Sequence, residues 1–474
     1  MRQRKVHFIG IGGAGMSGLA QLLLRRGIAV SGSDLAASAA TERLRALGAQ
    51  VYIGHDGAHI AEESPDEVIV SSAVPPGNPE LVAARERGVP VVHRGELLAR
   101  LMQERVGIAV AGTHGKTTTT SMIALSLLRA GLDPTIAIGG DLPDIGSNAR
   151  AGEGPYFVAE ADESDRSFLL LRPHIAVVTN IEADHLENYR STAAIVAAFR
   201  EFVERVPSDG LVVLGADDPN AAGLAPLPAR VVTYALRRPA DYTVRDVELV
   251  GLGSRAVVVE RGEPLGELEL RVPGMHNIAN ALAAIAVGRH LGVGFPALAA
   301  ALAGFRGAKR RFEIMGEERG ILVIDDYAHH PTEIRATLAA ARQLDRRVVA
   351  VFQPHRYTRT HFLGQELARS FDDADQVVLT DIYAASEQPI PGVTIDGVFA
   401  AARAAAGDKV LLVRDKEAIP AVLLEVARPG DVVITLGAGD VRRVGERFLA
   451  LLRAHQPEAT AVSPTAPKPA GGRP

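Results

Sequence analysis

The chain has 474 residues, of which 47% are hydrophobic and 23% charged, which is typical of a globular protein with room for about three domains. The net charge of −5 provides no overall positive field for nucleic acid, and the absence of cysteine excludes disulfides, cysteine nucleophiles and thiolate metal sites. Only six residues are lysine, so a lysine inside a chemical motif is informative.

The N-terminus superficially imitates a signal peptide, because Arg2, Arg4 and Lys5 precede a charge-free run over 6–24. Five glycines interrupt that run, which favours a strand, a glycine loop and the start of a helix. No other segment approaches the roughly 20 apolar residues of a membrane span. We therefore expect a soluble, cytoplasmic protein without membrane insertion.

The order of apolar and turn residues predicts an α/β protein with three domains, at 1–104, 105–306 and 307–454. The first and third domains alternate strands and helices, as Rossmann-like sheets do. The remaining residues, 455–474, hold five prolines and two glycines, and we expect them to be disordered.

Individual elements can be predicted within each domain. In the first, the strands are KVHFIGIG, AVSGSD and DEVIVSSAV, with helices over 16–26 and 96–102. In the second, the predicted strands are VGIAVAG, YFVAEAD, HIAVVTN and GLVVLG, and residues 242–272 are predicted to form antiparallel ribbons. Helices are predicted over 117–129 and 277–291. A further helical face is indicated by the spacing of Ile195, Val196, Phe199, Phe202 and Val206. In the third, the strands are ILVIDDY, RVVAVFQ, QVVLTDIY, KVLLVRD and DVVITLG.

A first glycine loop follows the first strand and fits the pattern G-x-G-x-x-G: Gly10, Ile11, Gly12, Gly13, Ala14 and Gly15. Such glycines let the backbone approach a diphosphate, to which the following helix offers N–H groups. Asp34, at the end of the second strand, is placed to bind a ribose hydroxyl. A tight turn without a ligand and a dinucleotide site are the competing interpretations.

A second glycine loop resembles a P-loop, although two residues rather than four separate its glycines: Gly112, Thr113, His114, Gly115, Lys116, Thr117 and Thr118. Lys116 is the only lysine between Lys5 and Lys309, which capping of a helix by threonines does not explain. We expect Lys116 to bind the β- and γ-phosphates of a nucleoside triphosphate and the Thr117 hydroxyl to bind Mg²⁺. The central domain is thus predicted to be of the P-loop ATPase type.

Two acidic strings, EADESD at 160–165 and TNIEADH at 179–185, follow other strands of the same domain. Parallel strands present their carboxyl ends at one edge of a sheet, where ligands bind. Hard oxygens with one imidazole suit Mg²⁺ together with phosphate, whereas a single acidic residue would more often be a solvated loop residue.

Three further strings carry polar side chains at chemically useful spacing. Asn277 and Asn280 lie one helical turn apart and suit a purine edge, although capping explains Asn277 equally well. DDYAHHP at 325–331 could form a metal site or supply a general base. In QPHRYTRT, Arg356 and Arg359 are three residues apart and could clamp a carboxylate between their guanidinium groups. The alternative is that both are ordinary surface arginines.

Together these strings closely resemble the Mur ligase family over about residues 5–450. GIGGAGMSG, GTHGKTTTT, EADESD, TNIEADH, PGMHNIAN, KRRFE, DDYAHHPTE and QPHRYTRT occur in the family's order. The resemblance implies a UDP-binding Rossmann-like domain, a central ATPase and a C-terminal Rossmann-like domain. It implies that ATP phosphorylates the lactyl carboxylate of UDP-N-acetylmuramate and that the amine of L-alanine attacks the acyl phosphate, releasing ADP and phosphate.

The resemblance also implies roles at the matching positions. The ATP side comprises Gly112, Thr113, His114, Gly115, Lys116, Thr117, Thr118, His276, Asn277, Asn280 and Arg310 (or Arg311, facing phosphate or substrate). The UDP-sugar side comprises Gly10, Gly12, Gly13, Ala14, Gly15, Asp34, Ser71 and Ser72, and the amino-acid pocket comprises Tyr327, His355, Arg356 and Arg359. The expected Mg²⁺ ligands are Thr117, Glu160 and His185, and the expected catalytic residues are Lys116, His329 (helping to deprotonate the amine), Arg356 and Arg359.

One departure from the family concerns a carbamylated lysine that several members carry near a second metal. Residues 117–308 contain no lysine, so this chain lacks that group, and a carboxylate such as Glu182 is a candidate replacement. The alternatives within and outside the family are a ligase that attaches a recycled tripeptide to the same UDP-sugar, an NAD-dependent dehydrogenase and a non-catalytic nucleotide-binding module. We expect a monomer or homodimer, with no nucleic-acid partner.

Overall fold

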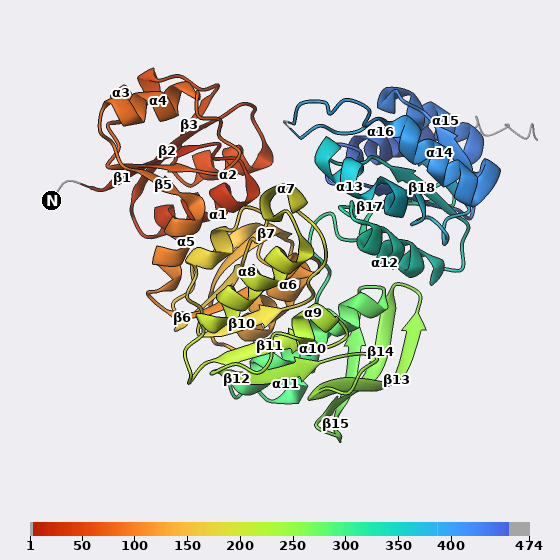
Figure 1. Cartoon of the computed structure of the whole chain (residues 1–474), viewed down its shortest axis with the longest axis horizontal. Helices are drawn as coiled ribbons and strands as arrows, with labels where there is room; N and C mark the ends of the chain where they lie inside the picture. Colours follow the sequence, from red (N-terminus) through yellow and green to blue (C-terminus); the bar gives the residue numbers. More distant parts are fainter. Residues whose placement is uncertain (1–2, 386, 455–474) are drawn as a thin grey trace, which may run out of the picture.

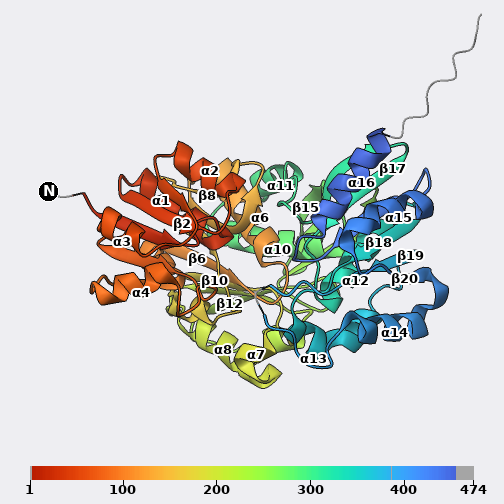
Figure 2. The same ribbon diagram turned by 90° about the horizontal axis from the view of Figure 1, so that it is seen from above.

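The computed structural model describes residues 3–385 and 387–454, which form three α/β domains in succession. Figure 1 shows the N-terminal and C-terminal domains on the upper left and upper right of the central domain, and Figure 2 shows them on opposite sides from above. The predicted fold class is confirmed. No helix within the described ranges is long and apolar enough to cross a membrane. The tail predicted at 455–474 lies outside the described residues.

The N-terminal domain is a parallel five-stranded sheet with five helices. Its elements are β1 (Lys5–Ile9), α1 (Ala14–Arg25), β2 (Ala29–Asp34), α2 (Ala39–Ala46), β3 (Gln50–Ile53), α3 (Ala58–Glu63), β4 (Glu67–Val70), α4 (Pro79–Glu86), β5 (Val91–His93) and α5 (Arg94–Met102). The strand order is β3-β2-β1-β4-β5: the chain builds the sheet outward from β1 to β3 on one side, and then returns to add β4 and β5 on the other side of β1. Ligands bind at such a reversal in open α/β sheets, so the loop after β1 lies where a ligand is expected.

A carboxylate is buried in this domain, among three histidines. Glu80, at the start of α4, is fully buried, and its oxygens lie 3.5 Å from His7, 3.1 Å from His55 and 2.6 Å from His59; Ser33 also donates a hydrogen bond to it. Burial alone would raise the pKa of Glu80, but the interactions with His7, Ser33 and His59 outweigh it and lower the pKa to about 2.

The Glu80→Gln substitution should make the free energy of unfolding depend less on pH in the acidic range. Because the folded pKa lies below the ordinary value of 4.5, the carboxylate contributes stability above about pH 5, up to about 3 kcal/mol, and this contribution disappears as pH falls toward 2. Urea unfolding followed by circular dichroism should therefore show a wild-type advantage at pH 7 that shrinks steadily below pH 5. The exposed Glu86→Gln change on the same helix is the matched control; an equal pH dependence in both variants would contradict this role of Glu80.

The central domain is built on a ten-stranded mixed sheet. Its strands are β6 (Val106–Ala111), β7 (Thr135–Leu142), β8 (Ser147–Arg150), β9 (Tyr156–Glu160), β10 (Ile175–Val178), β11 (Leu211–Gly215), β12 (Arg230–Tyr234), β13 (Tyr242–Val250), β14 (Gly253–Glu260) and β15 (Glu263–Leu270). Its helices are α6 (Lys116–Arg129), the 3-10 turn η1 (Ser167–Leu170), α7 (Leu186–Tyr189), α8 (Thr192–Glu204), α9 (Pro219–Ala222), α10 (Met275–His290) and α11 (Phe295–Ala303).

The order of this sheet is β15-β14-β13-β12-β11-β10-β6-β9-β7-β8. β6 pairs in parallel with both β9 and β10, so the loops after these three strands meet at one edge. The antiparallel ribbons predicted over 242–272 are confirmed as β13, β14 and β15. The hairpin of β7 and β8 was not expected from the sequence; it packs against α1 of the N-terminal domain.

The C-terminal domain has a six-stranded sheet. Its elements are β16 (Glu313–Glu318), β17 (Ile321–Asp326), α12 (Pro331–Arg342), β18 (Val348–Phe352), α13 (Tyr357–Ala368), β19 (Gln376–Leu379), α14 (Ile395–Ala406), η2 (Gly407–Lys409), β20 (Val410–Leu412), η3 (Lys416–Ala418), α15 (Ile419–Val426), β21 (Val432–Leu436) and α16 (Arg442–Ala454). The order is β16-β17-β21-β18-β19-β20, and only the edge strand β16 is antiparallel to its neighbour. All five predicted strands of this domain are present.

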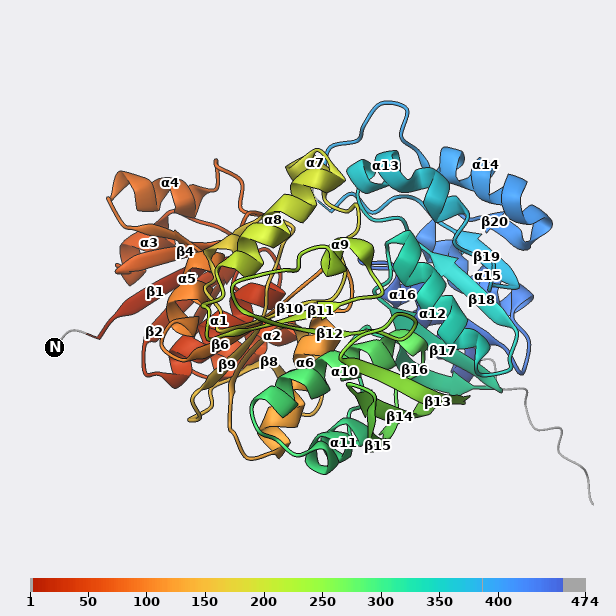
Figure 3. The same cartoon turned by 60° about the horizontal axis from the view of Figure 1, so that its bottom comes forward.

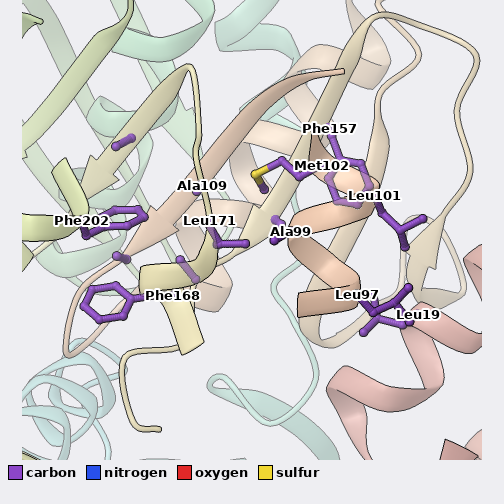
Figure 4. Packing of buried hydrophobic residues seen from close by; sticks show 14 of the residues in the cluster. Leu19, Leu97, Ala99, Leu101, Met102, Ala109, Phe157, Phe168, Leu171 and Phe202 are labelled. Carbon is purple, nitrogen blue, oxygen red and sulfur yellow. The ribbon is translucent and has the colours of Figure 1, made fainter. Parts of the chain in front are cut away.

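The apolar cores join two domains but not the third. One cluster runs from the N-terminal domain, through Leu19, Leu97 and Met102, into the central domain at Phe157 and Phe168 (Figure 4). The clusters of the C-terminal domain contain only residues from that domain. Because apolar burial is the main non-directional source of cohesion, the C-terminal domain depends on polar contacts for its position against the rest.

Candidate active site

The second glycine loop connects β6 to α6 and is fixed by crowding. Gly112 has φ +142°, and a Cβ added there would overlap the Thr179 hydroxyl; Gly115 has φ +79°, and a Cβ there would lie 2.8 Å from Asn280 Oδ1. Both positions therefore require glycine. Asn180 holds the same loop, because its main-chain oxygen accepts from Thr113 N and its Oδ1 accepts from His114 N, each at 2.9 Å.

Helix α6 begins in this loop at Lys116 without a side-chain cap, so its first N–H groups remain available to an anion. Lys116 Nζ donates to Gly112 O at 2.6 Å, to Thr113 O at 3.0 Å and to Glu163 Oε1 at 2.8 Å. Burial alone would lower the pKa of Lys116, but the nearby carboxylates, Glu163 foremost, raise it above its usual value. The loop thus presents a permanently charged lysine beside a helix N-terminus.

Two of the three predicted magnesium ligands lie together. Thr117 Oγ1 donates to both oxygens of Glu160, at 3.2 and 3.0 Å, and Gly139 N donates to Glu160 Oε2 at 2.9 Å. The third, His185, instead lies against Asp184 and Glu187, at 3.6 and 3.5 Å. The structure therefore supplies a pair of hard oxygen donors at the start of α6, and the role of His185 as a ligand stays a prediction.

Two of the remaining acidic residues of EADESD, Asp162 and Asp165, are paired with side chains of the N-terminal domain. Arg94, the first residue of α5, donates to Asp162 at 2.6 Å and to Asp165 at 3.0 Å, and Ser72 donates to Asp165 at 2.5 Å. Burial alone would raise the pKa of Asp162, but Arg94 lowers it well below its usual value. Cations from two domains, Arg94 and Lys116, thus pair with these carboxylates, while burial and the charge of Asp162 still raise the pKa of Glu163.

The first glycine loop lies close to this bridge. A Cβ on Gly15 would lie 3.1 Å from Arg94 Nη1, so the bridging arginine contacts the start of α1. Asp34 Oδ2 accepts from Gly12 N at 2.8 Å, which fixes the loop and leaves the carboxylate partly engaged. Gly10 has φ +80°, and α1 has no side-chain cap on its Gly13 N-cap. Contacts of this loop, Ser71 and Ser72 with a UDP-sugar stay predictions.

The predicted adenine residues occupy the first turn of α10, which lies beside α6 (Figure 3). Asn280 Oδ1 accepts from Thr119 Oγ1 at 3.1 Å, and its amide donates to Asn277 Oδ1 at 3.3 Å. Asn277 donates in turn to Pro273 O at 2.7 Å. Asn280 therefore ties α10 to the helix of the nucleotide loop, Asn277 braces Asn280, and the exposed His276 is the freest of the three residues to meet a base.

The C-terminal strings bring a basic cluster to the same region. Arg359 donates from Nε and Nη2 to the two oxygens of Asp184, at 3.2 and 3.1 Å, and from Nη1 to His355 O at 3.3 Å. Arg356 Nη1 lies 3.3 Å from Glu187 Oε1. Burial alone would raise the pKa of Asp184, but Arg359 lowers it far below its usual value. Both predicted clamp arginines are therefore engaged with the central domain.

Two histidines in this cluster are held neutral. Burial lowers the pKa of His329 to about 3 and that of His355 to about 2, with Arg359 adding to the effect in each case. His329 Nδ1 lies 2.8 Å from Tyr327 O, and its ring meets that of His355 edge-on at 5.8 Å. A neutral imidazole is free to accept a proton, but a pKa this low makes His329 a weak base in this arrangement.

Arg310 points into the C-terminal domain. Its Nε donates to Asp325 Oδ2 at 2.9 Å and its Nη2 to Gly437 O at 2.7 Å. The guanidinium groups of Arg310 and Arg311 lie over the Tyr327 ring at 5.0 and 5.1 Å. Arg310 therefore packs on Tyr327, a residue predicted for the amino-acid pocket, and both that pocket and the contact of Arg310 with phosphate stay predictions.

His114, in the nucleotide loop, bridges the central and C-terminal domains. Its Nε2 lies 3.4 Å from Glu182 Oε2 and its Nδ1 3.2 Å from Glu333 Oε1, while Thr332 Oγ1 donates to Glu182 Oε2 at 2.6 Å. Burial alone would lower the pKa of His114, but Glu182 and Glu333 outweigh it and raise the pKa to about 9. The loop that carries Lys116 is thus bonded directly to the first turn of α12.

Sequence reasoning missed Arg94, Asp184 and Glu333 as functional residues. Arg94 follows the end of β5, as the predicted site residues follow other strands, so its position was a usable signal. Glu333 stands three residues after His330 and completes a capping box with it, which is also visible in the sequence. Asp184 lies inside a string already noted, but only its pairing with Arg359 distinguishes it from its neighbours.

Comparison with known proteins agrees with this arrangement along the chain. Three family models match: the Mur ligase family catalytic domain at 5–106, the Mur ligase middle domain at 110–288, and the Mur ligase glutamate ligase domain at 310–439. The chain belongs to the Mur ligase family. The resemblance noted in the sequence is confirmed, and the family implies the use of ATP.

Individual relatives are similar over nearly their whole length. The UDP-N-acetylmuramate–L-alanine ligase of Pelotomaculum thermopropionicum is 53% identical over 458 residues, which cover 96% of this chain and 99% of the relative. That of Symbiobacterium thermophilum is 50% identical, with both chains fully covered. Among solved structures, the UDP-N-acetylmuramate–alanine ligase MurC of Thermotoga maritima has a TM-score of 0.82 at 32% identity, covering 95% of this chain and all of that one.

A murein peptide ligase structure from Psychrobacter arcticus is also similar, with a TM-score of 0.72 at 28% identity, covering 95% of this chain and 98% of that chain. A structure from Neisseria meningitides named as UDP-N-acetylmuramate:L-alanyl-γ-D-glutamyl-meso-diaminopimelate ligase has a TM-score of 0.60 at 31% identity, covering 65% of this chain and all of that one.

The Gly112→Ala substitution should weaken nucleotide binding in this Mur ligase. The new methyl group would overlap the Thr179 hydroxyl in a backbone conformation unfavourable for alanine, at a cost of about 1–3 kcal/mol, and the loop would shift. Calorimetric titration with ATP should show weaker binding, and thermal unfolding should occur at lower temperature. Gly77→Ala is the control, because Gly77 has open space around its Cα; unchanged ATP affinity in Gly112→Ala would contradict the assigned role of the loop.

Proposed function

We propose that the chain is an ATP-dependent ligase that joins L-alanine to the lactyl carboxylate of UDP-N-acetylmuramate in peptidoglycan precursor synthesis. The observation that carries the proposal is identity of about one half, over nearly full length, to relatives named for this reaction. The geometry agrees, since one contact network joins the glycine loop of the N-terminal domain, the nucleotide loop and the arginine cluster of the C-terminal domain.

The first step transfers the γ-phosphoryl group of ATP to a lactyl carboxylate oxygen, with ADP as the leaving group. Negative charge builds up on the transferred group and on the β-phosphate, so a fixed cation is most valuable there. Lys116 is suited to this task, because its charge is maintained and its present partners are carbonyl oxygens and Glu163, which a phosphate can replace as acceptor. The uncapped N-terminus of α6 adds N–H donors.

Magnesium fits the pair formed by Thr117 and Glu160. A hydroxyl and a carboxylate about 3 Å apart at a helix N-terminus offer hard oxygens, and Mg²⁺ ordinarily takes one or two protein ligands together with phosphate and water. When bound, the ion would neutralise charge on the phosphate oxygens. Gly139 N also donates to the Glu160 carboxylate and helps to fix its orientation.

The second step forms the amide bond. The neutral alanine amine attacks the carbonyl carbon of the acyl phosphate, and the tetrahedral intermediate collapses as inorganic phosphate leaves with the bonding electrons. The nitrogen passes its proton to water or to the neutral imidazole of His329. Arg359 and Arg356 come from the C-terminal domain and offer donors for the alanine carboxylate. The neutral His329 and His355 keep the pocket from adding positive charge, which would repel an ammonium group.

The C-terminal contacts explain why two domains are needed for this chemistry. Arg359 is held by Asp184, which follows the same strand as Asn180, a residue that fixes the nucleotide loop. Binding of an amino acid at Arg359 and binding of nucleotide at Lys116 therefore act on one connected set of side chains. A cytoplasmic location and a monomeric or homodimeric state stay predictions.

An amino-acid panel should identify the substrate. With ATP, Mg²⁺ and UDP-N-acetylmuramate present, phosphate release should be fast with L-alanine and negligible without an amino acid. Release with the tripeptide L-alanyl-γ-D-glutamyl-diaminopimelate but not with alanine would instead establish the recycling ligase. Saturable NADH binding, measured by fluorescence, would favour the dehydrogenase alternative.

The Lys116→Ala substitution should reduce kcat by at least about 100-fold, with a smaller change in KM for ATP. The reason is that the lysine charge is needed most where charge develops in the transition state. Coupled measurement of ADP release gives both constants. Lys5→Ala, at the start of β1, is the matched loss of a lysine outside the site and should retain full activity. A Lys116→Ala enzyme with normal kcat would rule out the phosphate role.

A further inference from the structure

A cluster of metal-binding side chains lies between the nucleotide loop and the C-terminal domain, apart from the Thr117–Glu160 pair. His114, Glu182 and His330 each offer one ligand atom, and these three atoms lie within 4.8 Å of one another. Two come from loops of the central domain and one from the residue before α12. We propose that these three residues bind a transition-metal dication such as Zn²⁺ or Co²⁺ and thereby link the two domains.

The orientation of His114 supports this proposal. Its Nδ1 faces Glu333 Oε1 at 3.2 Å, while its Nε2 faces Glu182 Oε2 at 3.4 Å. In metal sites, a ligating histidine donates its second N–H to a carboxylate or carbonyl oxygen, which fixes the ring and increases its basicity. Glu333 provides that carboxylate, so Nε2 is the nitrogen directed at the cluster.

Glu182 has equivalent support. The hydroxyl of Thr332 donates to its Oε2 at 2.6 Å, as outer hydrogen bonds to ligating carboxylates do. The same oxygen lies 3.6 Å from His330 Nδ1, so Glu182 stands between the two imidazoles.

His330 supplies an independent observation. It is only 4% exposed, its Nδ1 accepts from Thr332 N at 3.4 Å as the cap of α12, and its Nε2 forms no hydrogen bond with any described residue. Its ring centre lies 4.6 Å from that of His114 at an angle of 44°, so the two imidazoles are in contact. Burying an imidazole nitrogen without a hydrogen-bond partner destabilises the fold, so a ligand bound to this histidine would offset that cost.

The ligand set selects the metal. Two imidazoles and one carboxylate suit Zn²⁺, Co²⁺ and related ions, whereas Mg²⁺ and Ca²⁺ prefer oxygen ligands alone. Three protein ligands leave a fourth tetrahedral position for water or a phosphate oxygen. The site is therefore chemically distinct from the magnesium position, and it adds a metal-coordination link where the two domains share no apolar core.

Cobalt binding to the full-length protein tests the proposal without relying on ligase activity. Titration of the wild-type protein with Co²⁺ should produce the intense visible absorption bands of a tetrahedral site at one equivalent, and Zn²⁺ should abolish them. His330→Gln should lose these bands, and so should Glu182→Gln, with circular dichroism verifying that each variant is folded. Thr332→Val should retain the site with roughly tenfold weaker affinity, measured against a competing chelator.

Two controls make the outcome decisive. His361→Gln removes an exposed histidine of α13 and should bind Co²⁺ like the wild type. Bands that survive in both His330→Gln and Glu182→Gln would overturn the proposal. So would bands that disappear in Glu160→Gln but persist in His330→Gln, because they would belong to the magnesium position, and so would a wild-type spectrum no stronger than that of Co²⁺ in buffer.

Discussion

The contacts around the nucleotide loop link all three domains. Lys116 binds Glu163, the neighbouring Asp162 and Asp165 bind Arg94 of the N-terminal domain, and His114 binds Glu333 of the C-terminal domain. These groups are largely buried, so each charge must be matched or its desolvation would be prohibitively costly. The loop of residues 112–117 therefore lies at the centre of a group of paired charges that come from all three domains.

The two interfaces of the central domain differ in physical character. A continuous apolar cluster joins it to the N-terminal domain, and the hairpin of β7 and β8 reinforces that contact. The C-terminal domain meets it through ion pairs and hydrogen bonds, among them Arg359 with Asp184 and Thr332 with Glu182. Polar contacts can be exchanged for contacts with a charged ligand, whereas an apolar core cannot, so a change in domain position would disturb less apolar packing at the second interface than at the first.

The Mur ligase strings locate the correct strand ends, but they do not say which side chains are paired. The sequence correctly brought Thr117 and Glu160 to one edge, because both follow parallel strands of one sheet. It grouped His185 with them, yet that ring lies against Asp184 and Glu187, since its backbone takes a left-handed conformation at the start of α7. The sequence also predicts that Asn277 and Asn280 face a purine; the structure shows their amides bonded to Pro273 and Thr119, and the purine contact stays a prediction.

The sequence alone determined many of the strands and helices, although not the hairpin of β7 and β8, and it determined the two glycine loops, the isolated lysine of the central domain and the family, because these depend on local residue types and spacing. The prediction of three domains also follows from the length of the chain and from its repeated strand–helix patterns. Only the tertiary structure decided that Arg94 neutralises the acidic string and that His114 meets Glu333, since these partners are separated by about 70 and 220 residues. Long-range pairing depends on how whole domains pack, and no local pattern encodes it.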